Sequence, residues 1–259
     1  MKKTLVLSSV ALLACGLMSS CGDSTAEPVA CSAYGVVNGG ACVAEVKLTV
    51  ADKLIKTISI NETYTPVTWT ELSATEAETV ENISVEVTSW SGTKTINYAK
   101  YVKVDGVVYT GEKLDAAADG QYVKYMAGTV SLMEKIKDNS EWYWNCVVDA
   151  ANKITVASNA EGTAVSDHVY FAQKAFKADE NSTYWPQTAT ALGWKGNIAA
   201  IEAYLVGKDP SKIASFVKAT EAGEDEKKYF MDGTVSTGAT INATDAYLQL
   251  AKAAFAKVK

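Results

Sequence analysis

The feature that most constrains the fold is an alternation of apolar and polar residues between positions 43 and 60. A period of two places alternate side chains on opposite faces of a β-strand. Residues 51–53 interrupt the pattern with an Ala-Asp-Lys turn. We therefore predict a β-hairpin here, which has to bury its apolar face against another layer of the protein.

Further strands and then helices are expected along the chain. The Asp105-Gly106 pair favours a tight turn within a second hairpin over 101–111. The other expected elements are strands at 83–87 and 154–158, two short helices within 131–151, and helices over 195–206, 210–219 and 243–258. This order predicts an α+β fold: a single domain with early antiparallel strands and hairpins, a mostly helical C-terminal half, and the loop at 236–240 preceding the last helix.

Composition narrows the class of protein. The chain has 259 residues, 48% of them hydrophobic and 21% charged, which is typical of a globular protein. Its 30 acidic residues face 24 basic ones, all of them lysine, and His168 is the only histidine. Nucleic-acid binding normally uses a basic surface with arginine, and zinc sites and Ser-His-Asp hydrolases need several convergent groups. We therefore expect no nucleic-acid partner, no metal site and no hydrolase.

The first residues have the pattern of an export signal. Two lysines, an apolar run and small residues fill 1–20, a stretch too short to serve as a stable membrane span. The sequence becomes polar at Cys21, and the Ser19-Ser20-Cys21 junction resembles the lipobox of bacterial lipoproteins. Cys15 is a competing lipidation site, and a secreted protein without lipid is a further alternative. Lipid on Cys21 would hold the protein on the extracytoplasmic face of the cell membrane.

These signals divide the chain into a signal peptide at 1–20, a tether at 21–42 and a domain at 43–259. Removal of Lys2 and Lys3 leaves 22 lysines against 30 acids, a net charge of −8, so lipid and not charge would attach the protein to the membrane. Export permits disulfides, and Cys31 and Cys42 could close a small loop around Gly39.

A loop of small residues precedes the last expected helix. Ser236, Thr237, Gly238, Ala239 and Thr240 combine hydroxyl groups with a glycine that lets another group approach the backbone. Free backbone N–H groups at the start of a helix can hold a phosphate. The alternative is that these residues only cap the helix.

The string STGAT resembles the flavin-attachment motif of the FMN-binding domain family. The resemblance implies a role for Thr237, Gly238 and Ala239 in the motif and makes Thr240 the residue whose hydroxyl is esterified by the phosphate of FMN. Residues 194–219 are similar to the segment before the motif in lipid-anchored members, and 98–112 and 141–147 are similar more faintly. The implied protein is an electron carrier and not an enzyme. Its partners would be a flavin transferase that uses FAD and Mg²⁺, and a redox donor in the membrane.

One position departs from the family pattern. The family usually has aspartate six residues before the modified threonine, where this chain has Thr234, and the nearest acid is Asp232. The displaced acid supports an alternative function, a ligand-binding or interaction lipoprotein without flavin. Trp185, Trp194 and Tyr229 are aromatic candidates for stacking on a flavin, with a place in the core as the alternative for each.

Overall fold

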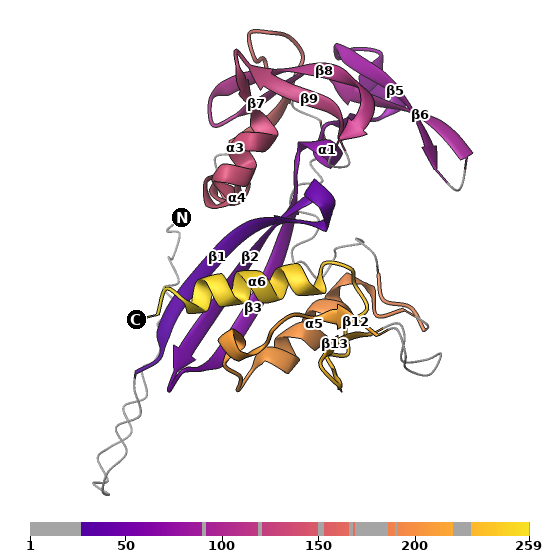
Figure 1. The fold of residues 1–259 in the computed structure, drawn as a ribbon. Helices are drawn as coiled ribbons and strands as arrows, with labels where there is room; N and C mark the ends of the chain where they lie inside the picture. The colour runs from indigo at the N-terminus through magenta and orange to yellow at the C-terminus, as the bar shows by residue number, and fades with distance from the viewer. Residues whose placement is uncertain are drawn as a thin grey trace, which may run out of the picture.

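The computed structural model describes residues 27–89, 92–118, 121–149, 153–165, 168, 186–189, 191–219 and 229–258. Figure 1 shows two lobes. The basal lobe contains β1 (Val29–Val37), η1 (Asn38–Gly40), β2 (Cys42–Ala51), β3 (Leu54–Tyr64), α5 (Gly193–Leu205), η2 (Pro210–Lys212), β12 (Val217–Lys218), β13 (Phe230–Asp232), β14 (Val235–Ser236) and α6 (Thr244–Phe255). The distal lobe contains the elements between β3 and α5.

The distal lobe is built mainly from two antiparallel sheets. One has the order β4-β6-β5, and the other has the order β10-β9-β8-β7-β11. The elements are α1 (Pro66–Trp69), β4 (Glu71–Leu72), α2 (Ala74–Ala77), β5 (Asn82–Ser89), β6 (Gly92–Ala99), β7 (Tyr101–Val104), β8 (Val107–Ala118), β9 (Gln121–Ala127), β10 (Val130–Ser131), α3 (Leu132–Asp138), α4 (Ser140–Val148) and β11 (Ile154–Ala157).

The basal lobe is a three-stranded antiparallel sheet, β1-β2-β3, with helices on one face. α6 packs across β1 and β2, and α5 packs against β3. Gly35 on β1 allows the close approach of α6, because a Cβ atom at this position would lie 2.8 Å from the Cδ2 atom of Leu250. The sheet alternation predicted for 43–60 therefore has its physical cause in the burial of one face under α6 and α5.

The two lobes meet through α4, which covers one end of the opposite face of the basal sheet. The Trp144 ring packs against Tyr34 of β1, with 6.1 Å between ring centroids. The buried Tyr143 hydroxyl donates to the backbone oxygen of Tyr64 at 2.6 Å and accepts from the Trp69 indole at 2.8 Å. Buried apolar side chains form one continuous core through both lobes.

The expected α+β class with a mostly helical C-terminal half is wrong. The described chain is strand-rich, with 42% strand and 28% helix, and its strands form four antiparallel sheets. β11 joins the large distal sheet, and β12, β13 and β14 form a small sheet of their own. The strand expected at 154–158 is β11, whereas β12, β13 and β14 were not predicted, because strands of two or three residues are too short to show a period.

Two boundaries also change. β1 begins at Val29 and pairs along its whole length with β2, so the folded part of the chain starts inside the segment expected to be a tether. The helix expected over 210–219 is a single 3-10 turn followed by the short strand β12. Here the Phe216 N–H donates to the Asp245 carboxylate of α6 at 2.7 Å, which holds the backbone in an extended path.

The strongest local patterns are confirmed. Asp52 and Lys53 both have positive φ, as do Asp105 and Gly106, so each hairpin turns where its sequence predicts. α3 and α4 are separated at Asn139, and the helices predicted at 195–206 and 243–258 are α5 and α6. The 236–240 loop does precede α6.

Candidate functional site

The STGAT segment begins at Ser236, the last residue of β14, and residues 241–243 separate its last residue, Thr240, from α6. Gly238 has φ of +77°, a left-handed conformation that side chains other than glycine rarely adopt. A Cβ at this position would lie 3.5 Å from the Cβ atom of Ala200 on α5, so the loop lies directly against that helix. Glycine at 238 is therefore favoured by the turn, whereas the space beside Ala200 would accept a Cβ atom.

The backbone N–H groups of this loop are used internally. Gly238 N–H donates to the Ser236 hydroxyl at 3.1 Å, and Ala239 N–H donates to the Thr237 hydroxyl at 3.2 Å. The buried Thr237 hydroxyl in turn donates to the backbone oxygen of Phe230 at 2.7 Å. Ser236, Thr237, Gly238 and Ala239 thus build the loop and do not present N–H groups to a phosphate, and they do not cap α6 either, since its N-cap is Ala243.

Thr240 lies at the end of this network, against a buried amide of α5. The Oδ1 atom of Asn197 accepts from the Thr240 N–H at 2.5 Å, from the Thr240 hydroxyl at 3.1 Å and from the Ile241 N–H at 3.0 Å. Asn197 is fully buried, and its Nδ2 atom donates to the backbone oxygen of Gly193 at 2.7 Å. Thr240 itself is only partly buried.

A pocket of about 380 Å³ lies at the N-terminal end of α5 and is lined in part by Thr240. Its remaining lining residues are Gln187, Thr188, Ala189, Ala191, Leu192 and Tyr229. Pockets that bind cofactors start at about 300 Å³ and combine apolar walls with a few polar groups. The lining combines apolar and polar residues, since it includes Leu192 and Tyr229 as well as Thr240 and Gln187.

One face of α5 holds the whole motif segment. Asn197, Ala200 and Tyr204 follow one another at helical spacing, and each contacts a different part of residues 230–241. The Tyr204 hydroxyl donates to the Asp232 carboxylate at 2.8 Å. Desolvation, reinforced by this hydrogen bond and charge, raises the pKa of Tyr204 to about 12. Asp232 therefore anchors the β13–β14 hairpin to α5, whereas Thr234 is exposed in the hairpin turn.

A buried carboxylate lies behind this face. Glu62 of β3 is fully buried and accepts from the Trp194 indole at 2.9 Å, from the Asn38 amide at 3.0 Å and from the Tyr247 hydroxyl. Burial raises the pKa of Glu62 to about 7, although the three donors favour the charged form. Glu62 thus connects η1 with α5, which bonds Thr240 through Asn197, and with α6, which follows Thr240 in the chain.

Sequence reasoning missed Asn197 and Glu62, although each leaves a trace in the pattern. Glu62 occupies an apolar-face position after Ile58 and Ile60, and Asn197 interrupts the apolar stripe of α5 next to Ile198. A polar residue on a buried face has to find a partner, and this requirement marks it for attention.

The structure separates the aromatic candidates for stacking on a flavin and shows the surroundings of the only histidine. Trp194 is buried in the core with its indole on Glu62, so it is not a stacking surface, whereas Tyr229 does line the pocket beside Thr240. The buried His168 ring lies between the Glu76 carboxylate at 2.7 Å and the backbone oxygen of Trp69 at 2.6 Å. Cys21 and Trp185 lie outside the described residues.

The suggested Cys31–Cys42 disulfide does not form. Cys31 pairs with Leu48 across the β1–β2 ladder, which places Cys31 about 20 Å along the strands from Cys42. The third described cysteine, Cys146, is a buried free thiol of α4.

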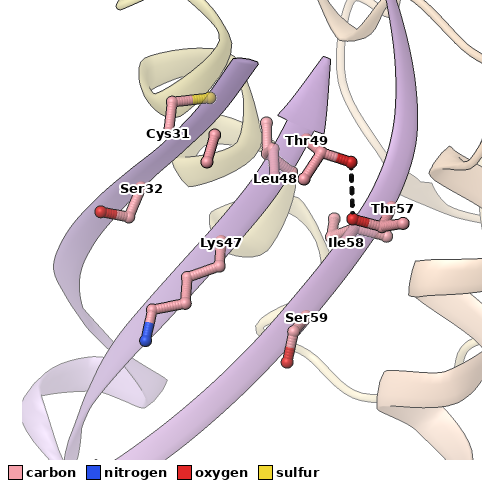
Figure 2. Close-up of a pocket in the computed structure, with 9 residues that line it drawn as sticks. Cys31, Ser32, Lys47, Leu48, Thr49, Thr57, Ile58 and Ser59 are labelled. Atoms are coloured by element: carbon pink, nitrogen blue, oxygen red, sulfur yellow. Dashed lines mark hydrogen bonds between the residues drawn. The ribbon is translucent and has the colours of Figure 1, made fainter. Parts of the chain in front are cut away.

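A second pocket, of about 440 Å³, lies on the face of the basal sheet opposite α6, beyond the end of that face that α4 covers. Figure 2 shows Lys47, Ser59 and Ser32 on this open face, together with Thr49 and Thr57, whose hydroxyls share a hydrogen bond of 2.7 Å. The Lys47 ammonium pairs with Glu45 at 3.0 Å. The exposed lining of this pocket is mainly apolar, and its hydroxyl groups lie on β1, β2 and β3 and not in the STGAT segment.

Comparison with protein-family models, with curated proteins and with solved structures found no match to this chain. Within the described residues there is no helix long and apolar enough to cross a membrane. The same part of the chain contains no cluster of three or more histidine, cysteine, aspartate or glutamate side chains placed to hold a metal ion.

Proposed function

We propose that this chain is an extracytoplasmic electron-transfer flavoprotein that carries FMN covalently on Thr240 and is anchored to the cell membrane by lipid on Cys21. The observation that carries the proposal is the position of Thr240. Its hydroxyl lies at the boundary between a rigid, internally bonded loop and a pocket of ligand size. The STGAT motif supplies the chemical identity of the expected group.

The residues around Thr240 fit such a group. A phosphoester on Thr240 would need no separate phosphate clamp, which agrees with a loop whose N–H groups are already bonded and with a chain that has no arginine. Leu192 and Tyr229 would provide an apolar wall and an aromatic surface beside the ring system, and Gln187 would provide a polar group. Bound FMN would supply the electron transfer, and the protein would hold it and control its exposure to water.

Attachment would depend on a flavin transferase that uses FAD and Mg²⁺. In a balanced reaction, Oγ1 of Thr240 forms a bond to the phosphorus of the FMN half of FAD, the pyrophosphate bond breaks, AMP leaves, and the hydroxyl proton is released. Thr240 is accessible for this reaction because it is only partly buried. A membrane redox donor would then reduce the loaded protein.

The test is co-expression of the exported protein with a flavin transferase, followed by denaturation and measurement of the intact mass. We expect an FMN-sized adduct on the wild type, none on Thr240→Ala, and an adduct on Thr240→Ser, which keeps a hydroxyl. A wild type without adduct contradicts the proposal, and an adduct on Thr240→Ala contradicts the assignment of the site. Membrane fractionation of Cys21→Ala, which we expect to release the protein, tests the anchor separately.

A further inference from the structure

We infer that Asn197 is a positioning residue for the covalent attachment of FMN to Thr240. The inference deepens the proposed function and rests on it. It concerns how the attacking hydroxyl is aimed, a role that the motif itself does not assign.

The orientation of the Asn197 amide is fixed from both ends. Three donors of the loop point to Oδ1, and one backbone carbonyl, that of Gly193, accepts from Nδ2. The reversed amide would place N–H groups against N–H groups and an oxygen against an oxygen, so the hydrogen-bond network excludes it. Because Asn197 is fully buried, water cannot replace these bonds.

The hydrogen bond to Asn197 fixes the orientation of the Thr240 hydroxyl group. Its proton points to Asn197 Oδ1, at 3.1 Å between the oxygens, so the lone pairs of Oγ1 point away from α5. Thr240 also lines the pocket at the N-terminal end of α5, together with Leu192, the N-cap of that helix. A phosphorus atom held in this pocket would approach Oγ1 at these lone pairs.

Asn197 cannot take the proton permanently, because an amide oxygen is a hydrogen-bond acceptor and not a base at neutral pH. When the bond from Oγ1 to phosphorus forms and the bond to the AMP leaving group breaks, the proton leaves Oγ1 for water or for a base of the transferase. The two backbone bonds from Thr240 N–H and Ile241 N–H persist through this step and keep the loop in place.

The experiment measures single-turnover attachment with purified transferase, FAD and Mg²⁺, using full-length mature protein. Asn197→Leu keeps the size of the side chain and removes the acceptor, and Asn197→Asp keeps an acceptor oxygen. We expect the maximal rate for Asn197→Leu to fall about 10- to 100-fold with little change in the concentration that gives half-maximal rate, since misplacement of a reacting group by about 1 Å costs up to about 100-fold. We expect Asn197→Asp to recover only part of that rate, because it keeps the acceptor for the loop but replaces the donor to the Gly193 carbonyl with an oxygen.

Thr244→Val is the matched control, because it removes a buried hydroxyl that donates to the backbone oxygen of Ile241 but does not contact Thr240. We expect it to attach FMN at the wild-type rate, even where it lowers stability as much as Asn197→Leu. Hydrogen exchange of the unmodified proteins provides a second readout, in which the Thr240 and Ile241 amides lose protection in Asn197→Leu alone.

The outcomes separate the two proposals. A wild type that accepts no FMN contradicts the proposed function, and the exchange data then show only whether Asn197 holds the loop. A wild type that accepts FMN, together with an Asn197→Leu variant that accepts it equally fast, overturns the positioning role alone. An equal loss of rate in Thr244→Val and Asn197→Leu also overturns it, because loss of loop stability would then suffice.

Discussion

The two lobes share one core but are organised by different interactions. The buried hydrogen bonds of the distal lobe join neutral groups, such as the Trp69 indole and the Tyr143 hydroxyl. All the buried carboxylates of the described chain, those of Glu45, Glu62 and Glu202, belong to the basal lobe. Glu62 joins α5 to α6, and Glu202 of α5 accepts from the Ile60 N–H of β3 at 2.8 Å.

This difference has a physical meaning. A buried hydrogen bond requires one register, since a misplaced donor or acceptor loses about 1–3 kcal/mol, and a buried carboxylate that loses its donors costs more. The basal lobe is the one that has to hold the Thr240 hydroxyl in a fixed direction. Polar contacts between its helices and its sheet serve that need, at some cost in stability.

The largest effect is expected from removing a central tryptophan of either lobe. Trp194 in the basal lobe and Trp69 in the distal lobe are both fully buried, and each donates from its indole, to Glu62 and to the Tyr143 hydroxyl respectively. We expect Trp194→Ala and Trp69→Ala each to lower the free energy of unfolding by about 3–5 kcal/mol. Because the core is continuous, urea unfolding of both should show one transition.

Trp194→Phe and Trp69→Phe remove less of the side chain, so we expect each to lower the free energy of unfolding by less than the alanine variant does. A second transition in Trp194→Ala, with the distal lobe still folded, would contradict a shared core and would show that the lobes are separate folding units.

The next effect is a pH dependence that belongs to the basal lobe. The pKa of Glu62 is raised from 4.5 to about 7, so between these values the native state holds a proton that the unfolded chain releases. The free energy of unfolding is therefore highest at low pH, where Glu62 is protonated in both states. It falls as the pH rises from about 4.5 and stops falling above about pH 7. Relative to Glu62→Gln, which cannot ionise, the wild type should lose about 2–3 kcal/mol between pH 5 and pH 8.

Chemical denaturation at several pH values measures this difference. Tyr247→Phe sharpens the test, because the Tyr247 hydroxyl lowers the pKa of Glu62, and its removal should extend the loss of stability to higher pH. A wild type and a Glu62→Gln variant that change in parallel with pH would show that Glu62 does not titrate in this range.

The smallest effect compares the packing of two glycines. A Cβ at Gly111 of the distal lobe would lie 2.9 Å from both Ile83 and Val123, whereas a Cβ at Gly35 would meet only the end of Leu250. Leu250 can turn aside, but the two β-branched neighbours of Gly111 are held in the sheets. We expect Gly111→Ala to cost about 1–3 kcal/mol and Gly35→Ala less than about 1 kcal/mol, measured by thermal unfolding. Equal costs would contradict a tighter distal packing.

The same contrast explains what the sequence could predict. The hairpin turns at Asp52-Lys53 and Asp105-Gly106 and the helix α6 were predicted correctly, because turn chemistry and amphipathic periodicity are local properties. The helix expected over 210–219 was wrong because a contact made far along the chain, from Phe216 N–H to Asp245, decides its backbone. β1 was taken for a tether, although pairing with β2 makes it a strand.

The candidate site shows the same limit. The motif at 236–240 was visible as a loop of small residues, but the partners of that loop come from α5, about 40 residues earlier in the sequence. Ser236 and Thr237 accept from loop N–H groups only two residues away, but Asn197, which accepts from Thr240 and Ile241, is brought to the loop only by the fold.

The most direct test of the central claim is localisation of the flavin by peptide mass. Trypsin should cleave after Lys228 and Lys252, which gives a peptide of residues 229–252 with Thr234, Thr237, Thr240 and Thr244. For protein co-expressed with a flavin transferase, we predict that this peptide carries an FMN-sized addition and that fragmentation places it on Thr240. An unmodified peptide, or an addition on another of these threonines, would contradict the account.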